Sequence, residues 1–279
     1  MPEFMHVGSL IVDDIQDKSE TRRGGPCAHL IYGEPLAINA GTAAYFQCEQ
    51  LISAPGLTDA ETVKCYKLYF AALRGGHAGQ ALDIHGNDYL MDEVVETGDA
   101  ALLEQRICAI HRLKTAVPAG TLARMGCTVG GGTDAQIEAV GRFMEAVGVA
   151  FQIMDDVLNL RGIYSSKADK KAGTMLKTLG EDIVDGKVTM PVALYMARMR
   201  DRERRKSIWE TIKSKPEDPV VVQGVIDELE RVGAVQACVE MSNKIVEDAW
   251  AIVDKSIPDS FSKMMLRSFG WFVTEQSGG

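Results

Sequence analysis

The chain has no excess of positive charge, no clustered cysteines and no long apolar run. It carries 30 Lys+Arg against 39 Asp+Glu, a formal net charge of −9, whereas proteins that neutralise nucleic-acid phosphates need the opposite balance. The six cysteines form no CxxC pair and no Cys/His pair at zinc spacing, so we expect a reduced, cytoplasmic protein. Charges or glycines interrupt every apolar stretch before about 18 residues accumulate, which predicts no transmembrane segment and no secretion signal.

Strand-like alternation of apolar and polar residues is also scarce. Apolar residues instead recur at intervals of three and four, as at Leu103, Ile107 and Ile110, which is typical of amphipathic helices. Glycine, proline and polar residues punctuate this pattern at 22–26, 54–58, 130–133, 162–173 and 213–219. The valines at 220–222 are the best strand candidate, but the periodicity that follows favours a helix beginning just after Pro219. We predict an all-α bundle in a single domain over residues 1–279.

Three aspartates, Asp13, Asp14 and Asp17, follow an apolar run and precede a Gly/Pro turn. Asp13 and Asp17 are four residues apart, so on a helix they share a face, where like charges repel unless a cation offsets them. Ligand sets made only of oxygen suit Mg²⁺, which bridges to substrate phosphates. A solvated acidic helix end is the alternative interpretation of this motif.

A second acidic cluster consists of Asp155 and Asp156, followed by Asn159, in FQIMDDVLNL. Apolar side chains surround these acids, and buried carboxylates must be paired or bound to a metal. Two such clusters can face each other across the interior of a helical bundle. The pattern therefore predicts a metal site. His77, His85 and His111 carry no metal-binding spacing and are expected to be structural.

Cations stand where an anionic ligand of these metals would need them. They are Arg22, Arg23, Lys114, Lys177 and Lys187. Guanidinium groups bind diphosphate oxygens bidentately, and lysines add point charge. Taken singly each is a surface charge, but together with the acids they predict a site for diphosphate and Mg²⁺. The lysine-rich stretch 164–176 fits equally well a solvated loop or a cationic flap over an anionic ligand.

The motifs DDIQD, RRG, HAGQALDI, LKT, FQIMDD and GEDIVDGKVTMP follow one another between Phe4 and Pro191. In this order they resemble the trans-isoprenyl diphosphate synthase family, and most closely its fungal geranylgeranyl diphosphate synthases. The resemblance implies an isoprenoid-synthase-type helical bundle around a central cavity. It also implies condensation of isopentenyl diphosphate with dimethylallyl, geranyl or farnesyl diphosphate to give C20 geranylgeranyl diphosphate, assisted by three Mg²⁺ ions per site, in a homodimer or higher homo-oligomer.

Carried over residue by residue, the family's Mg²⁺ ligands fall on Asp13, Asp17 and Asp155, with Asp14 and Asp156 alongside. The family's allylic diphosphate contacts match Arg22, Lys114, Thr115, Gln152, Asn159, Lys177 and Lys187. Arg23 matches the arginine that holds isopentenyl diphosphate. Lys114, Thr115 and Gln152 are the expected catalytic residues, because they would stabilise the departing diphosphate and the allylic cation. Gln80 and Asp83 fit either a helix lining the cavity or a polar pair inside the bundle.

Product length is expected to be set one helical turn before Asp13. Gly8 and Ser9 are small there, so a growing hydrocarbon passes where an aromatic side chain would stop it. This favours a C20 product over C15, and a C25 product remains the alternative. Phe4 or Met5, a further turn away, would form the floor of the pocket.

Two features depart from the family pattern. The family's N-terminal helices have no counterpart here, and only His6 matches their histidine region, so we expect an N-terminally incomplete domain. Such a domain fits the C-terminal prenyltransferase part of a bifunctional terpene synthase, or a non-catalytic assembly domain of a larger synthase. The loop before Lys177 is also longer than usual. A class I terpene cyclase would need a second metal motif whose spacing NKIVEDAW, from Asn243, does not supply.

Overall fold

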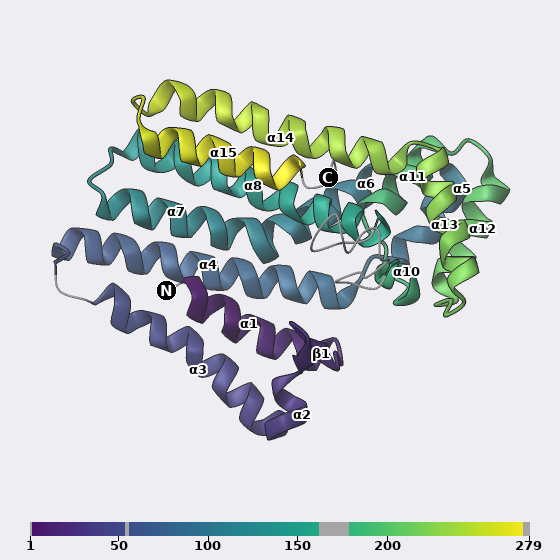
Figure 1. The fold of residues 1–279 in the computed structure, drawn as a ribbon, viewed down its shortest axis with the longest axis horizontal. Helices are drawn as coiled ribbons and strands as arrows, with labels where there is room; N and C mark the ends of the chain where they lie inside the picture. Colours follow the sequence, from purple (N-terminus) through teal and green to yellow (C-terminus); the bar gives the residue numbers. More distant parts are fainter. Residues whose placement is uncertain (1, 54–55, 162–178, 276–279) are drawn as a thin grey trace. The chain divides into compact units, whose positions relative to one another are not determined.

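A computed structural model describes residues 2–53, 56–161 and 179–275, and helices dominate this part of the chain (Figure 1). The strands in these ranges are β1 (Thr21–Arg22) and β2 (Gly25–Pro26), which pair antiparallel as a short hairpin. The prediction of an all-α fold is confirmed. None of the described helices has the length and apolar content that a membrane span requires.

The chain divides into two compact units. Unit 1 comprises Met1–Ala71 and Met125–Gly132, and unit 2 comprises Ala72–Arg124 and Thr133–Gly279. Two of the three boundaries fall inside helices, at residues 71/72 and 124/125, so each of these two helices contributes residues to both units. The single domain expected over residues 1–279 stays a prediction.

Unit 1 is built on a close contact between two helices. Its elements are α1 (Pro2–Gln16), the β1/β2 hairpin, α2 (Ala28–Tyr32), α3 (Glu34–Ile52), the first part of α4 (Asp59–His85) and the last part of α7 (Val117–Val129). Gly8 of α1 and Gly41 of α3 face one another. A Cβ atom added to Gly8 would lie 2.6 Å from the Gly41 carbonyl oxygen, so only glycine permits this approach. The small size of Gly8 therefore has a packing reason.

Unit 2 holds the remaining elements. They are the rest of α4 and α7, η1 (Asp88–Leu90), α5 (Met91–Thr97), α6 (Ala101–His111), the π-helix η2 (Arg112–Ala116), α8 (Asp134–Arg161), α10 (Glu181–Val184), α11 (Met190–Arg198), α12 (Arg202–Lys213), α13 (Pro219–Arg231), α14 (Ala234–Ser256) and α15 (Phe261–Glu275). The long helices α8 and α14 lie side by side (Figure 1). Helix α13 begins at Pro219, as expected, because the Asp218 carboxylate caps it by accepting from the Val220 N–H over 2.9 Å.

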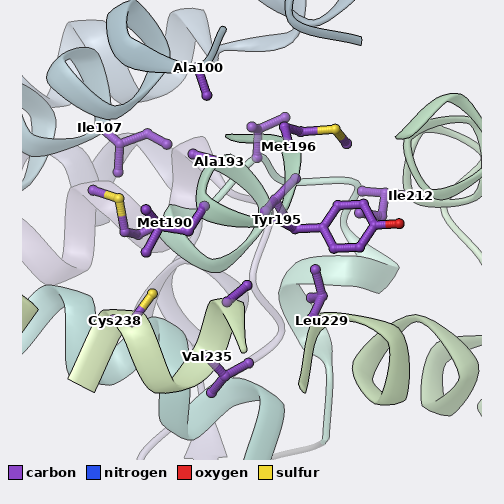
Figure 2. Packing of buried hydrophobic residues seen from close by; sticks show 14 of the residues in the cluster. Ala100, Ile107, Met190, Ala193, Tyr195, Met196, Ile212, Leu229, Val235 and Cys238 are labelled. Carbon is purple, nitrogen blue, oxygen red and sulfur yellow. The ribbon is translucent and has the colours of Figure 1, made fainter. Parts of the chain in front are cut away.

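The main core of unit 2 forms around α11. Every residue from Met190 to Met196 is buried, and Tyr195 and Met196 pack with Ile212 and Leu229 from α12 and α13 (Figure 2). The Tyr195 hydroxyl remains satisfied because it donates to Glu228 Oε1 over 3.2 Å. A helix buried on all sides cannot shift easily, so α11 gives a rigid base to the segment that precedes it, which carries Lys187.

Candidate functional site

The first acidic cluster lies at the C-terminal end of α1. Asp13 and Asp14 belong to the last turn of the helix, and the Asp17 N–H donates to the Asp13 carbonyl over 2.8 Å. This bond continues the helical spacing, so Asp13 and Asp17 lie on one side of the helix end. Helix C-termini carry partial negative charge. The carboxylates of Asp13 and Asp17 at this position therefore repel both each other and the helix dipole, an arrangement that a bound cation would stabilise.

Asp14 is held differently from its neighbours. It is 3% exposed, and its Oδ1 accepts from Arg22 Nε over 2.9 Å and also from Arg22 Nη2. The hydrogen bond to Asp14 raises the pKa of Arg22, and the buried Cys27 lies against the same carboxylate. Asp14 thus ties the hairpin to α1. The role of Arg22 as a contact of allylic diphosphate stays a prediction.

Arg23 occupies the turn of the hairpin in a conformation that few side chains adopt. Its φ is +53° and that of Gly24 is +80°, the pair of positive values found in a type I′ turn. A residue with a Cβ costs roughly 1 kcal/mol or more in the left-handed region. Arg23 is exposed, and its Nη2 lies 3.5 Å from His6 Nε2. An arginine kept at a strained turn position suits a binding residue.

The second acidic cluster lies on α8 in unit 2. The Asp156 carboxylate is buried, and its Oδ2 accepts from the Met190 N–H over 3.0 Å. Asn159 is 1% exposed, and its Oδ1 accepts from the Asp182 N–H over 3.2 Å. Its Nδ2 has no acceptor among the described residues. These bonds brace α8 against the segment after residue 179, and neither of them uses Asp155, which is half-buried together with Gln152 on the same helix.

Lys114 and Thr115 lie in the π-helix η2, which the sequence did not predict. Lys114 Nζ donates to Asp83 Oδ2 of α4 over 2.7 Å, so the predicted cation and the polar residue of HAGQALDI form one pair. A Cβ added to Gly79 would lie 2.3 Å from the Lys114 nitrogen. The backbone of α4 therefore touches the backbone of the π-helix at the residue that carries the cation, and π-helical turns often occur at functional sites.

Lys187 projects from the chain just before α11. Its side chain is exposed, and Nζ lies 3.4 Å from Asp185 Oδ2. Its backbone N–H donates to the Asp182 carbonyl over 2.8 Å. Lys177 lies outside the described residues. Within those residues no three His, Cys, Asp or Glu side chains gather as a metal-binding group, and the two acidic clusters belong to different units, so their meeting stays a prediction.

Unit 2 also contains a buried histidine that should make stability depend on pH. Burial lowers the pKa of His111 from 6.5 to about 4, although Asp156 Oδ2 is only 3.8 Å away. When the pKa of a histidine is lower in the folded than in the unfolded state, protonation favours unfolding. The free energy of unfolding is therefore highest above pH 6.5 and falls as the pH drops towards 4. We expect a loss of roughly 3 kcal/mol at most over this window. Denaturant unfolding at pH 7 and 4.5 measures it, and His111→Gln should lose less; equal losses in both proteins would contradict the assignment.

Three comparisons place this chain among known proteins. A family model described as polyprenyl synthetase matches residues 1–229. The heterodimeric geranylgeranyl pyrophosphate synthase large subunit 2 of Arabidopsis thaliana is 31% identical over 207 residues, which cover 73% of this chain and 51% of the relative. The geranylgeranyl pyrophosphate synthase penG of the fungus Penicillium crustosum is 27% identical over 257 residues, covering 88% and 64%. The chain thus spans between half and two thirds of the length of these relatives.

A solved structure gives the same answer for the fold. Geranylgeranyl pyrophosphate synthase from Corynebacterium glutamicum, complexed with isoprenyl diphosphate and magnesium, superposes with a TM-score of 0.80, covering 99% of this chain and 77% of that chain at 23% identity. The predicted isoprenoid-synthase-type helical fold is confirmed. Because the family model extends from the first acidic cluster through α8 and α11 to α13, the chain belongs to the polyprenyl synthetase family.

Proposed function

We propose that this chain is a chain-elongating prenyltransferase that joins isopentenyl diphosphate to an allylic diphosphate and forms geranylgeranyl diphosphate. One observation carries the proposal. In each acidic cluster one carboxylate makes a structural bond: Asp14 binds Arg22, and Asp156 accepts from the Met190 N–H. The remaining carboxylates, Asp13, Asp17 and Asp155, match the metal ligands of the family. The relatives named as geranylgeranyl pyrophosphate synthases support the C20 product.

The proposed metal ligands are Asp13, Asp17 and Asp155. Their donor set fits Mg²⁺, since it is made of carboxylate oxygen and the first two lie at a helix end where negative charge accumulates. Three Mg²⁺ ions per site are proposed by analogy, and the similar Corynebacterium glutamicum structure is described with magnesium and isoprenyl diphosphate. When bound, the metal would neutralise charge that builds on the departing diphosphate.

The chain's own residues would carry the remaining steps. Arg22, Lys114, Lys187 and Lys177 would bind the allylic diphosphate, and the C–O bond would break with both electrons leaving on diphosphate. Hydroxyl and amide oxygens of Thr115 and Gln152 would stabilise the allylic cation without forming a covalent bond to it. Arg23 would hold isopentenyl diphosphate so that its double bond attacks the cation. A proton would then pass to the released diphosphate, which restores an alkene five carbons longer.

The proposed function includes a compartment and an assembly state. The enzyme would act in the cytoplasm as a homodimer or higher homo-oligomer, and it could be joined to a terpene cyclase domain in a bifunctional synthase. The heterodimeric Arabidopsis thaliana relative supports assembly from more than one subunit. Sedimentation of the purified chain measures its oligomeric state.

The test of the function is product analysis. The chain is incubated with isopentenyl diphosphate, farnesyl diphosphate and Mg²⁺, and the dephosphorylated products are identified by mass spectrometry. A C20 alcohol is the expected result. A C25 alcohol would keep the reaction and overturn the assigned product length. No product from a chain that retains its helical circular dichroism would contradict the proposal and favour an assembly domain.

Product length can be tested separately at Ser9. Its side chain is exposed on α1, and Oγ donates to the His6 carbonyl over 2.8 Å. Ser9→Phe is expected to shorten the product from C20 to C15 while the melting temperature changes little, because no buried group is displaced. Gly8→Phe would not be informative, since Gly8 contacts the α3 backbone. Unchanged C20 product from Ser9→Phe would remove this residue from the pocket.

A further inference from the structure

Asn87 and Arg106, two residues of unit 2 that lie outside every motif of the sequence, form a polar network. Arg106 of α6 donates from Nε to Asn87 Oδ1 over 2.9 Å and from Nη2 to the Gly86 carbonyl over 3.3 Å. Its guanidinium also lies 5.1 Å from the centre of the Tyr89 ring. Asn87 is 8% exposed, so its amide is removed from water and must find its partners inside the protein.

Arg106 determines which way the Asn87 amide faces. An arginine only donates hydrogen bonds, so it takes the oxygen end of the amide and leaves the nitrogen end for an acceptor. That acceptor is the Val188 carbonyl, 3.4 Å from Asn87 Nδ2. The amide therefore connects Arg106 of α6 to Val188, the residue that follows Lys187. Val188 lies 101 positions after Asn87 in the sequence.

The backbone around Lys187 is fixed on both sides. Before it, the Asp182 carbonyl accepts from the Lys187 N–H, and the Asp182 N–H donates to Asn159. After it, Asn87 holds Val188, and Asp156 accepts from the Met190 N–H. The Lys187 side chain is nevertheless 52% exposed. A cation whose backbone is held in place loses less entropy when it meets a ligand than one on a mobile loop.

We propose that Asn87, oriented by Arg106, is a positioning residue. It holds the backbone next to Lys187 so that the Lys187 ammonium group meets the allylic diphosphate. The inference rests on the proposed function, which assigns Lys187 to that diphosphate. Asn87 touches no substrate and acts only through the Val188 carbonyl. Its removal should therefore affect the binding of the allylic substrate and leave isopentenyl diphosphate unaffected.

Asn87→Asp tests this idea with a change of one atom. The carboxylate keeps an acceptor for Arg106 but turns a second oxygen towards the Val188 carbonyl, so attraction becomes repulsion. We expect KM for farnesyl diphosphate to rise about tenfold, with kcat and KM for isopentenyl diphosphate within about twofold. In a Lys187→Ala background, Asn87→Asp should have no further effect on KM. The matched control is Asn243→Asp, an exposed asparagine of α14, which should leave both KM values unchanged.

Several outcomes would overturn the inference. It fails if Asn87→Asp leaves KM for farnesyl diphosphate unchanged, or raises it equally with and without Lys187. If Asn87→Asp melts below the assay temperature, Arg106→Ala takes its place, because Arg106 is only half-buried, and the same selective rise in KM is expected. A wild-type chain that forms no product would overturn the proposed function together with the inference, whereas an active wild type with unaltered variants would overturn the inference alone.

Discussion

Replacing Asp13 with alanine is expected to lower prenyltransferase activity by about 10²–10³-fold while leaving the fold intact. The carboxylate lies in the last turn of α1, where Asp17 and the helix dipole oppose its charge and Arg22 attracts it. Because these effects oppose one another, removing the carboxylate from the metal-free protein should change the melting temperature little. A residue that adds little to the stability of the metal-free protein but is required for turnover acts in binding or catalysis, so the two measurements together test the role of Asp13.

The controls separate a metal ligand from a general effect of charge. Asp59→Ala removes an exposed acid from the first turn of α4 and should leave activity unchanged. Asp14→Ala should behave differently from Asp13→Ala, because it leaves Arg22 without its buried partner and should lower the melting temperature. Activity of Asp13→Ala above half that of the wild type at saturating Mg²⁺ would exclude Asp13 as a metal ligand.

Local signals in the sequence account for the helices and the acidic clusters. The start of α13 follows from Asp218 and Pro219, since a capping carboxylate and a proline at the first helical position act within one turn. The spacing of Asp13 and Asp17 likewise depends only on helix geometry. These features are predictable because the residues that cause them are neighbours in the sequence.

Which carboxylate of each cluster makes a structural bond depends on partners outside the cluster, and this was not predictable from the sequence. Asp14 is a structural acceptor because the chain after α1 folds back and brings Arg22, eight residues later, against it. Asp156 has a structural bond because α11 begins beside α8. Asn87 carries no signal at all, since an asparagine after a helix is ordinary and its partners lie 19 and 101 residues away. In each cluster the fold shows which carboxylate makes a structural bond, and the metal-binding role of the other carboxylates stays a prediction.

The π-helix η2 is a second feature that only the fold explains. A π-helical turn is rare and usually appears as a single turn within an α-helix. Two glycines of other helices touch this turn: a Cβ on Gly148 would lie 2.7 Å from Ala116 Cα, and one on Gly79 would lie 2.3 Å from the Lys114 nitrogen. The sequence places both glycines inside helices, where glycine is unfavourable. This unfavourable placement was the feature of the sequence that could have indicated a close backbone contact.

Gly79→Ala is therefore expected to damage both stability and activity. The added methyl group meets backbone atoms only, at 2.3–2.8 Å, so α4 and η2 must separate, at a cost of about 2–3 kcal/mol. Their separation would break the 2.7 Å contact between Lys114 and Asp83, and a displacement of about 1 Å at a binding residue can reduce turnover about a hundredfold.

The matched control lies one turn earlier on the same helix. At Gly76 an added Cβ would meet its nearest neighbour, Pro118 Cγ, at 4.0 Å, an ordinary contact, so Gly76→Ala should stabilise α4 by up to about 1 kcal/mol and keep full activity. Chemical denaturation and steady-state kinetics on both variants give the comparison. If Gly79→Ala were as stable and active as Gly76→Ala, the close approach of α4 to the Lys114 backbone would be wrong. If it lost stability but kept its KM for the allylic substrate, Lys114 would bind no diphosphate, because its backbone would have moved without consequence.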